Sequence, residues 1–249
     1  MKKRLDIALT ELNLARSRTA AQRIIQEGIV IVNGKVITKA SESVDVEIDT
    51  IELSEQPECM KYVGRGGFKL EKAIEYFNLQ IKDKICLDIG ASTGGFTDCM
   101  LKNGAEKVFA VDVGRDQLDD SLKNNSKVIS LEQLDIRYAD KEITESVDFI
   151  SIDVSFISLK HILPEILRFS SNNSECVALI KPQVENGKKK NGKNGVIRDQ
   201  KLHKKIVDDI IAFTEGLGFS SVEVIPSPIE GGDGNREFLM HFIINKKED

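Results

Sequence analysis

Residues 84–98, KICLDIGASTGGFTD, contain the pattern that decides the fold: an apolar strand, a glycine-rich loop and the start of a helix. The apolar run at 84–89 is typical of a strand buried on both faces of a sheet. Small residues follow it because the backbone turns sharply there and a ligand can approach it closely. Further strands are predicted at 107–113, 147–154, 176–181, 221–225 and 238–244, with a weaker one at 127–130.

Helical patterns lie between these strands. The clearest one has apolar residues on one face from Leu202 to Thr214, with Asp199 as its possible N-cap. Near-continuous apolar strands that alternate with amphipathic helices indicate a parallel sheet covered on both faces. We therefore expect a doubly wound, Rossmann-like α/β domain.

The spacing of the glycine-rich loop points away from a dinucleotide. A dinucleotide site has G-x-G-x-x-G, whereas this loop has Gly90, Gly94 and Gly95 after an acid, Asp88. An acid there would repel a pyrophosphate but can pair with the ammonium or sulfonium group of an amino-acid cofactor. Asp112 ends the next strand, where a carboxylate can accept hydrogen bonds from ribose hydroxyls. S-adenosylmethionine has this chemistry, while the simpler alternative is a plain strand-to-helix turn.

The predicted cofactor site extends along the same edge of the sheet. The loop resembles the first motif of class I methyltransferases, usually D/E-x-G-x-G-x-G, with Ser92 at the position of the middle glycine. The resemblance implies that Asp135 lies where such enzymes contact the adenine ring. The expected cofactor-binding residues are Asp88, Gly90, Ser92, Gly94, Gly95, Phe96, Asp112, Asp135 and Asp153.

Four charged residues stand at the ends of other elements. Asp153 and Lys181 end two predicted strands, at the carboxyl edge where ligands bind in open α/β sheets. Glu237 opens the last strand and reaches the same edge if that strand runs antiparallel. Lys69 opens the helix before the first strand. We expect these four side chains to converge at one site.

Such a group suits methyl transfer to a weak nucleophile. A ribose hydroxyl is a weak acid, so its proton must be stabilised or removed during in-line attack on a sulfonium methyl. We expect Lys181 to lie nearest the hydroxyl. Asp153 and Lys69 would orient and tune Lys181, and Glu237 would complete the network. The alternative for any one of these residues is a surface salt bridge.

The first fifty residues predict a separate small module. Leu5, Ala8 and Leu9 recur at helical spacing, and Ser17 can cap a second helix. Alternating residues around Asn33-Gly34 then predict a two-residue hairpin. The acidic stretch from 41 to 59 reads as the last strand of this module, running into a linker.

RLDIAL (4–9) and LARSRTAAQRIIQEGIVIVNGKVITKAS (14–41) resemble the RNA-binding module first described in ribosomal small-subunit protein four. The resemblance covers residues 3–50 and implies that a helix pair and a hairpin grip structured RNA. The expected RNA-binding residues are Arg4, Arg16, Arg18, Arg23, Lys35, Lys39, Arg65, Lys188, Lys189 and Lys190.

The distribution of charge agrees with an RNA partner. The net charge is −5, but residues 1–39 carry eight Lys/Arg against three acids, and residues 187–205 carry eight against one. Phosphate binding responds to such local patches, although a charge run taken alone is more often a solvated surface.

The composition excludes several other classes. No run approaches the length of a membrane span, residues 1–18 lack the apolar core of a secretory signal, and four cysteines are scattered without CxxC pairing. We expect a cytoplasmic protein without a metal site.

SIDVSFISL (151–159), IKPQVE (180–185) and SPIEGGDGNREFL (227–239) resemble the FtsJ-type ribose methyltransferases, specifically the hemolysin-A-like (TlyA) branch. The resemblance spans nearly the whole chain and implies that Lys69, Asp153, Lys181 and Glu237 are the catalytic tetrad. It also implies ribosomal RNA, alone or in a ribosomal subunit, as substrate and a cytidine 2′-hydroxyl as target. The expected domains are an S4-like module at 1–58, a linker at 59–66 and a methyltransferase domain at 67–249.

Three other functions remain open at this point. The hemolysin name suggests a toxin acting on membranes, although no basic amphipathic helix with aromatic anchors is evident. A non-catalytic RNA-binding ribosome assembly factor is the second, since a fold alone never proves activity. Methylation of a small molecule is the third, and it would leave the N-terminal module without a purpose.

Overall fold

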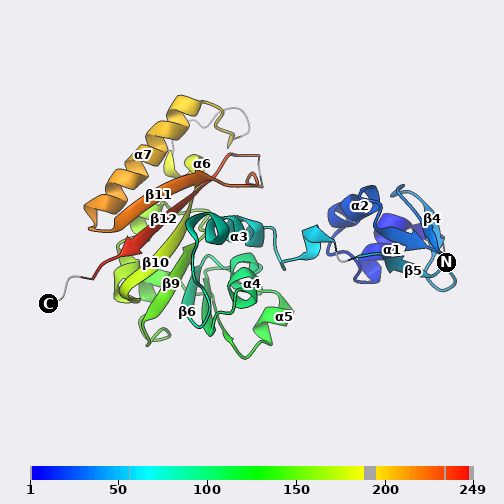
Figure 1. Ribbon diagram of the computed structural model, residues 1–249, viewed down its shortest axis with the longest axis horizontal. Helices are drawn as coiled ribbons and strands as arrows, with labels where there is room; N and C mark the ends of the chain where they lie inside the picture. The colour runs from blue at the N-terminus through cyan, green and yellow to red at the C-terminus, as the bar shows by residue number, and fades with distance from the viewer. Residues whose placement is uncertain (1, 56, 188–194, 233, 247–249) are drawn as a thin grey trace. The chain divides into compact units, whose positions relative to one another are not determined.

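The computed structural model describes residues 2–55, 57–187, 195–232 and 234–246 (Figure 1). The chain forms two compact units that divide between Tyr62 and Val63, inside the segment expected as a linker. We call residues 1–62 the N-terminal unit and residues 63–249 the C-terminal unit. Within the described ranges, no helix combines the length and apolar character that crossing a membrane requires.

The N-terminal unit packs two helices against short strands. Helices α1 (Leu5–Glu11) and α2 (Arg18–Gln26) contact each other, and strand β2 (Val30–Val32) pairs with β3 (Lys35–Val36). Two predictions are confirmed here. The side chain of Ser17 caps α2 by accepting a hydrogen bond from the Ala20 amide, and Asn33 and Gly34 both have positive φ, as a type I′ hairpin turn requires.

The acidic stretch forms two strands where the sequence predicted one. Strand β4 (Ser43–Asp45) pairs with β1 (Lys2–Arg4), and β5 (Ile51–Leu53) pairs with β2. A turn separates them because the Asp49 carboxylate accepts hydrogen bonds from the Asp45 amide (2.7 Å) and from Asn33 Nδ2 (2.8 Å). A local side-chain acceptor of this kind competes with continued strand pairing.

The C-terminal unit is built on one seven-stranded sheet in the order β11-β12-β10-β9-β6-β7-β8. Strands β10, β9, β6, β7 and β8 run parallel, whereas β12 is antiparallel to β10 and β11 is antiparallel to β12. Every predicted strand is present: β6 (Ile85–Ile89), β7 (Lys107–Asp112), β8 (Val128–Glu132), β9 (Val147–Ile152), β10 (Ser170–Ile180), β11 (Ser220–Pro226) and β12 (Phe238–Ile244).

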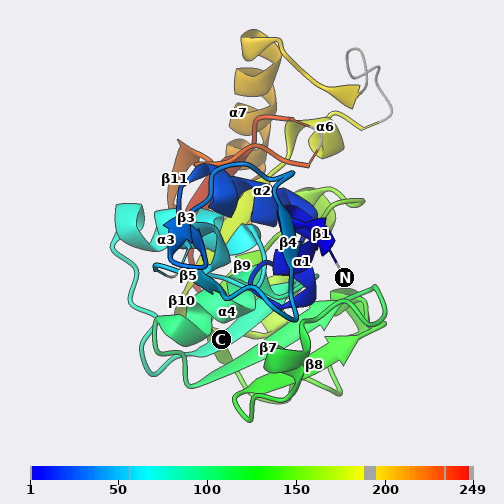
Figure 2. The ribbon, with the colours of Figure 1, turned by 90° about the vertical axis from the view of Figure 1, so that its right-hand side faces the viewer.

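Helices and helical turns cover the sheet on both faces. On one face α3 (Gly66–Phe77) packs against α4 (Gly95–Lys102) and β12. On the other, α7 (Gln200–Gly216) packs against β11 and the short helical turn η3 (Leu159–His161). Figure 2 shows α7 at one end of this unit and β7 and β8 at the other. The shorter helical segments are α5 (Asp120–Lys123), α6 (Pro182–Glu185), η1 (Glu58–Met60), η2 (Ile136–Tyr138) and η4 (Glu165–Arg168).

The main core lies between the sheet and the helical segments on the same side as α7. Its fully buried members include Leu87, Ile150, Ile152, Ile166 and Phe242. The Asp199 carboxylate caps α7, as predicted, by accepting a hydrogen bond from the Lys201 amide. The antiparallel direction of β12 brings its start, and therefore Glu237, to the carboxyl edge of β6 and β9. The doubly wound architecture is confirmed, and its strand ends define one edge for the site.

Candidate active site

The loop between β6 and α4 depends on glycine at two positions. Gly90 has φ of +84°, and a β-carbon there would lie 2.5 Å from the carbonyl oxygen of Asp153. Gly94 has φ of +93°, and its β-carbon would collide with Leu122. A side chain at either position would therefore be strained and would displace a neighbour. The two glycines therefore let the loop pack closely against its neighbours.

Asp88 lies beneath this loop and is fully buried. Its carboxylate accepts hydrogen bonds from Thr97 Oγ1 (2.7 Å) and Ser151 Oγ (2.9 Å). Burial raises the pKa of Asp88 to about 6, and the nearby charge of Asp153 acts in the same direction. Asp88 lines neither of the cavities described below and holds α4 against β9, so its expected contact with a cofactor stays a prediction.

A larger cavity of about 570 Å³ opens over the carboxyl ends of β6 and β7. Its lining residues include Ile89, Gly90, Ser92, Val111, Asp112, Asp135, Ile136, Asp153, Val154 and Phe156. Its volume is in the range of cavities that hold drug-sized ligands. Apolar walls with a few carboxylates at the rim suit a ligand that carries both an aromatic ring and a cation.

Two predicted cofactor residues stand on this rim. The Asp112 carboxylate accepts hydrogen bonds from the backbone amides of Ser92 and Gly114, both at 2.7 Å, so it fixes the loop while facing the cavity. Asp135 accepts hydrogen bonds from the Arg137 guanidinium, which lowers the pKa of this carboxyl. Asp135 is therefore ionised at neutral pH and can accept a hydrogen bond from a ligand.

A second, charged cavity of about 280 Å³ contains the four predicted catalytic residues. Lys69 Nζ donates to Glu237 Oε2 at 2.6 Å and lies 3.8 Å from Asp153 Oδ2. Lys181 Nζ lies 2.6 Å from Asp153 Oδ1 and donates to Ser155 Oγ at 2.9 Å. The structure thus joins Glu237, Lys69, Asp153 and Lys181 into one alternating chain of charges.

The two lysines and Glu237 are buried, and only 3% of Glu237 is exposed. The packing around Glu237 is close, since a β-carbon at Gly231 would lie 2.5 Å from its Oε1. Within the described residues, Asp153 Oδ1 is a buried atom that has no well-aligned hydrogen bond despite its short distance to Lys181 Nζ. The two groups form an ion pair.

The charged cavity and the larger cavity meet. Gly90, Ser92, Asp153 and Ser155 line both of them. A ligand group in one cavity can therefore reach a group in the other across the glycine-rich loop. The arrangement can hold a donor molecule on one side and a hydroxyl-bearing acceptor beside Lys181 on the other.

The remaining predicted residues of this region divide between the two cavities. Gly95 and Phe96 line the charged cavity rather than the larger one, and Gly94 lines neither because it faces Leu122. Arg65, predicted to bind RNA, is exposed and lines the charged cavity. Among the described residues that were predicted to bind RNA, Arg65 is the one that lines the charged cavity.

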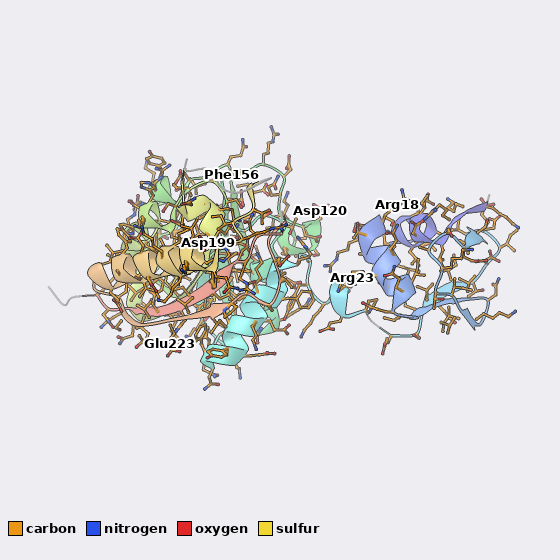
Figure 3. The ribbon with its side chains drawn as sticks, turned by 90° about the horizontal axis from the view of Figure 1, so that it is seen from above. Arg18, Arg23, Asp120, Phe156, Asp199 and Glu223 are labelled. Atoms are coloured by element: carbon orange, nitrogen blue, oxygen red, sulfur yellow. The ribbon has the colours of Figure 1, made fainter. Side chains whose placement is uncertain are left out.

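All six predicted RNA-binding residues of the N-terminal unit are exposed: Arg4, Arg16, Arg18, Arg23, Lys35 and Lys39. Arg18 and Arg23 belong to α2 (Figure 3). Arg4 and Arg18 also pair with the buried carboxylate of Asp6, and the Arg4 hydrogen bonds hold the pKa of that carboxyl well below its usual range. Lys188, Lys189 and Lys190 lie outside the described residues.

Three residues at or beside the two cavities were not predicted from the sequence. Ser155 accepts the Lys181 hydrogen bond, Glu185 accepts hydrogen bonds from Ser158 Oγ (2.5 Å) and the Leu159 amide (2.9 Å), and Phe156 is fully exposed beside the larger cavity (Figure 3). Glu185 follows Lys181 by one helical turn in IKPQVE, a spacing that could have indicated a shared face.

Comparisons with known families agree with this geometry. The FtsJ-like methyltransferase family matches residues 62–243, and the S4 domain matches residues 3–47. These matches confirm the resemblance found in the sequence for both parts of the chain.

Full-length relatives extend the agreement. Hemolysin A of Brachyspira hyodysenteriae is 46% identical over 97% of this chain and 100% of its own length. The 16S/23S rRNA (cytidine-2′-O)-methyltransferase TlyA of Mycobacterium tuberculosis is 38% identical over 95% of this chain and 88% of its own length. A solved structure from Streptococcus thermophilus is 42% identical, covers 98% of this chain and 89% of that one, and superposes with a TM-score of 0.73.

Proposed function

Because the chain belongs to the FtsJ-like methyltransferase family and carries an S4 domain, we propose that it methylates ribosomal RNA at a ribose 2′-hydroxyl, with cytidine as the target. The named activity of the Mycobacterium tuberculosis relative supports this substrate. We expect the enzyme to meet this substrate in the cytoplasm.

The observation that carries the proposal is the chain of charges Glu237–Lys69–Asp153–Lys181 at the point where the two cavities meet. Two buried lysines close to two carboxylates provide both a cation and proton acceptors beside the place where the methyl-accepting hydroxyl would bind. A hydroxyl needs this combination because it must lose its proton as its oxygen becomes alkylated.

The cofactor is S-adenosylmethionine, which supplies the methyl group when it is bound. The larger cavity fits it, since its apolar walls suit an adenine ring and its rim carries Asp112 and Asp135. Asp112 would hold the ribose hydroxyls and Asp135 would lie near the adenine. Asp88 would act indirectly, by fixing the loop through Thr97.

The catalytic residues have distinct tasks in this proposal. Lys181 holds the acceptor oxygen and stabilises the negative charge that develops on it. Asp153 orients Lys181 and receives the released proton, because its carboxylate is the nearest acceptor to Lys181 Nζ at 2.6 Å. Lys69 and Glu237 fix the other side of Asp153.

RNA recognition is assigned to the N-terminal unit and to the entrance of the charged cavity. The exposed arginines and lysines of the N-terminal unit would contact backbone phosphates, which positions the RNA without reading its sequence. Arg65 would contact the RNA at the charged cavity.

The proposal is tested by identifying the product. The purified full chain is incubated with labelled S-adenosylmethionine and ribosomal subunits from cells that lack the gene. The RNA is then digested to nucleosides for mass spectrometry. We expect 2′-O-methylcytidine, whereas methyl groups on a base, or on protein alone, would contradict the assignment.

The hemolysin name of one relative gives a second candidate, a membrane-damaging protein. Leakage of a dye from liposomes by the purified chain would support it, and we expect none. A non-catalytic assembly factor is the third candidate, and it predicts RNA binding with no methyl transfer in the product assay.

A further inference from the structure

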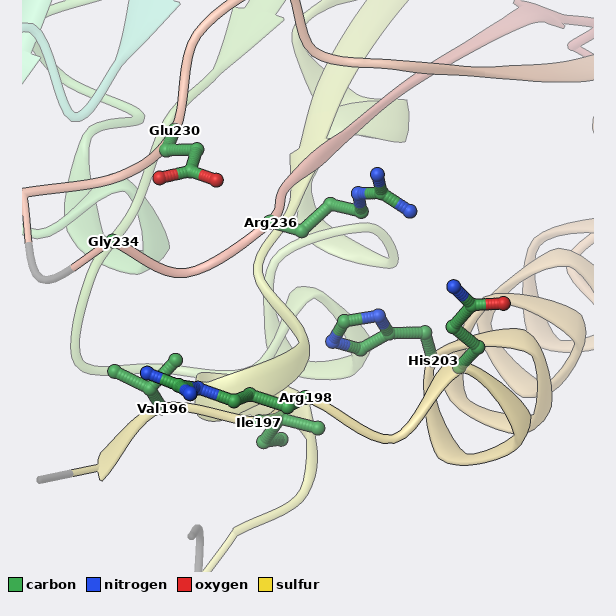
Figure 4. Close-up of a pocket in the computed structure, with 8 residues that line it drawn as sticks. Val196, Ile197, Arg198, His203, Glu230, Gly234 and Arg236 are labelled. Carbon is green, nitrogen blue, oxygen red and sulfur yellow. The ribbon is translucent and has the colours of Figure 1, made fainter. Parts of the chain in front are cut away.

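A third cavity of the C-terminal unit lies outside the site described so far. It measures about 500 Å³ and is lined by Val196, Ile197, Arg198, Gln200, His203, Glu230, Gly234 and Arg236 (Figure 4). We call it the arginine cavity. Two guanidiniums, an imidazole and one carboxylate give its described walls an excess of positive charge.

The arginine cavity is next to the charged cavity. Glu230 lines both of them, so the two cavities share part of the wall formed by the segment that follows β11. Arg236 and Glu237 are consecutive, and their side chains reach opposite sides of that segment: Arg236 lines the arginine cavity and Glu237 the charged cavity. A group bound by Arg236 therefore lies across this segment from the charged cavity.

The walls of the arginine cavity are held in place without a ligand. The buried side chain of Asn235 accepts a hydrogen bond from the Ile197 amide (3.1 Å) and donates one to the Gly195 carbonyl (3.4 Å). It therefore ties the segment before α7 to the loop that carries Arg236. The loop itself is closed by a hydrogen bond from the Gly231 amide to the Asn235 carbonyl (2.9 Å).

The polar groups of the arginine cavity lack partners of their own. Within the described part of the chain, the exposed side chains of Arg198 and Arg236 form no hydrogen bond or ion pair. His203 Nε2 is a buried atom without a hydrogen-bond partner, and only 7% of His203 is exposed. In Figure 4 the imidazole points from α7 toward the space bounded by Arg198, Glu230 and Arg236. A buried polar atom without a partner is costly, so a ligand that supplies one would be favoured.

We propose that the arginine cavity binds a backbone phosphate of the RNA substrate, one belonging to a nucleotide close to the methylated one. Guanidinium groups match phosphate oxygens in pairs of parallel hydrogen bonds, and His203 Nε2 adds a third contact. Glu230 lines both cavities and can accept a hydrogen bond from a 2′-hydroxyl of the same strand. The proposal deepens the proposed function and rests on it for the identity of the RNA.

The first arm of the test measures RNA binding. Arg236→Gln and Arg198→Gln are compared with Lys141→Gln, which removes one positive charge from an exposed position before β9, at the opposite edge of the sheet. Binding of the full chain to deproteinised ribosomal RNA is measured over a series of KCl concentrations. Each arginine variant should bind about tenfold more weakly and lower the slope of log K against log salt by about one, while Lys141→Gln changes neither.

The second arm locates the phosphate. Short RNAs that contain the methylated nucleotide are made with one neutral methylphosphonate linkage at a time. One linkage near the acceptor should raise the KM of the wild-type chain about tenfold and have no further effect on Arg236→Gln. If every linkage affects the wild type and Arg236→Gln equally, the arginine cavity does not hold a phosphate.

The two arms separate this proposal from the proposed function. If the wild-type chain methylates no RNA, the proposed function fails, and the salt slopes still decide whether the arginine cavity binds phosphate. If methylation occurs but both arginine variants match Lys141→Gln in slope and KM, the cavity proposal alone is wrong. Circular dichroism of each variant excludes unfolding as the cause of lost binding.

Discussion

Lys181 Nζ lies 2.6 Å from Asp153 Oδ1, although the two residues directly follow different strands, β10 and β9. The parallel pairing of these strands brings both ends to one edge of the sheet. Lys181 also donates to Ser155, so its ammonium group is held from two directions. A cation fixed in this way is preorganised to stabilise negative charge on an acceptor oxygen. Such preorganisation lowers the barrier because the cation need not move during the reaction.

The close packing at Gly231 predicts a sensitive position. Gly231→Ala places a β-carbon 2.5 Å from Glu237 Oε1 and must displace that carboxylate from Lys69. We expect methyl transfer to fall about 100-fold, with a melting temperature close to that of the wild type. Gly216→Ala, at the end of α7 with no atom near its β-carbon, is the matched control for steady-state kinetics. Equal activity of both variants would show that the position of Glu237 does not matter.

Asp88 predicts an unusual dependence of stability on pH. Its pKa is raised from 3.8 to about 6, so between these values the native state binds more protons than the unfolded state. Stability should therefore fall as pH rises from about 4 to 6, by on the order of 2–3 kcal/mol from this group. Asp88→Asn stays neutral and should lack that decline.

Urea unfolding followed by circular dichroism at several pH values checks the Asp88 prediction. Asp208→Asn, an exposed carboxylate on α7, serves as control and should follow the wild type. The prediction is wrong if Asp88→Asn shows the same change between pH 4 and 6 as the wild type does.

Glu185 is predicted to act as a positioning residue for the segment 155–159. Glu185→Ala removes the acceptor of Ser158 Oγ and of the Leu159 amide, so the segment that carries Ser155 and Phe156 loses its anchor on α6. We expect kcat to fall about tenfold with little change in the Kd for S-adenosylmethionine. Glu185→Gln keeps an acceptor oxygen and should restore most of the activity. A loss confined to thermal stability would reject the positioning role.

The basic residues of the N-terminal unit should separate into two groups. Arg23→Gln, Lys35→Gln and Lys39→Gln should weaken RNA binding and its salt dependence while the melting temperature stays constant. Arg4→Gln should also lower the melting temperature of the unit, because Arg4 gives two hydrogen bonds of 3.0 Å to the buried Asp6 carboxylate. Calorimetry and filter binding on the same samples distinguish the groups. Equal melting temperatures for all four variants would contradict this division.

The strands, the doubly wound sheet and the convergence of the four charged residues could be predicted because they follow from local patterns. Apolar strands carry their own signal, and charged residues at strand ends share an edge once the strands run parallel. Whether Glu237 reaches this edge depends on the direction of β12, which the sequence did not determine.

Other features depend on contacts that no local pattern reveals. The burial of Asp88 requires Thr97 from α4 and Ser151 from β9 as donors, and these residues are distant in sequence or lie on another element. The turn between β4 and β5 depends on Asn33 reaching Asp49 across the N-terminal unit. The arginine cavity is formed by two loops that Asn235 joins, so its residues give no common motif.

The central claim is tested most directly by mapping ribose methylation in ribosomal RNA from cells that lack the gene and carry the wild type, Lys181→Ala or Lys107→Ala. Lys107 belongs to a surface ion pair with Glu145 and provides the control. Cytidine 2′-O-methyl groups should appear with the wild type and Lys107→Ala and be absent with Lys181→Ala, whose purified protein should still bind S-adenosylmethionine. The account is contradicted if the pattern of 2′-O-methylation is the same in all strains, or if Lys181→Ala restores it fully.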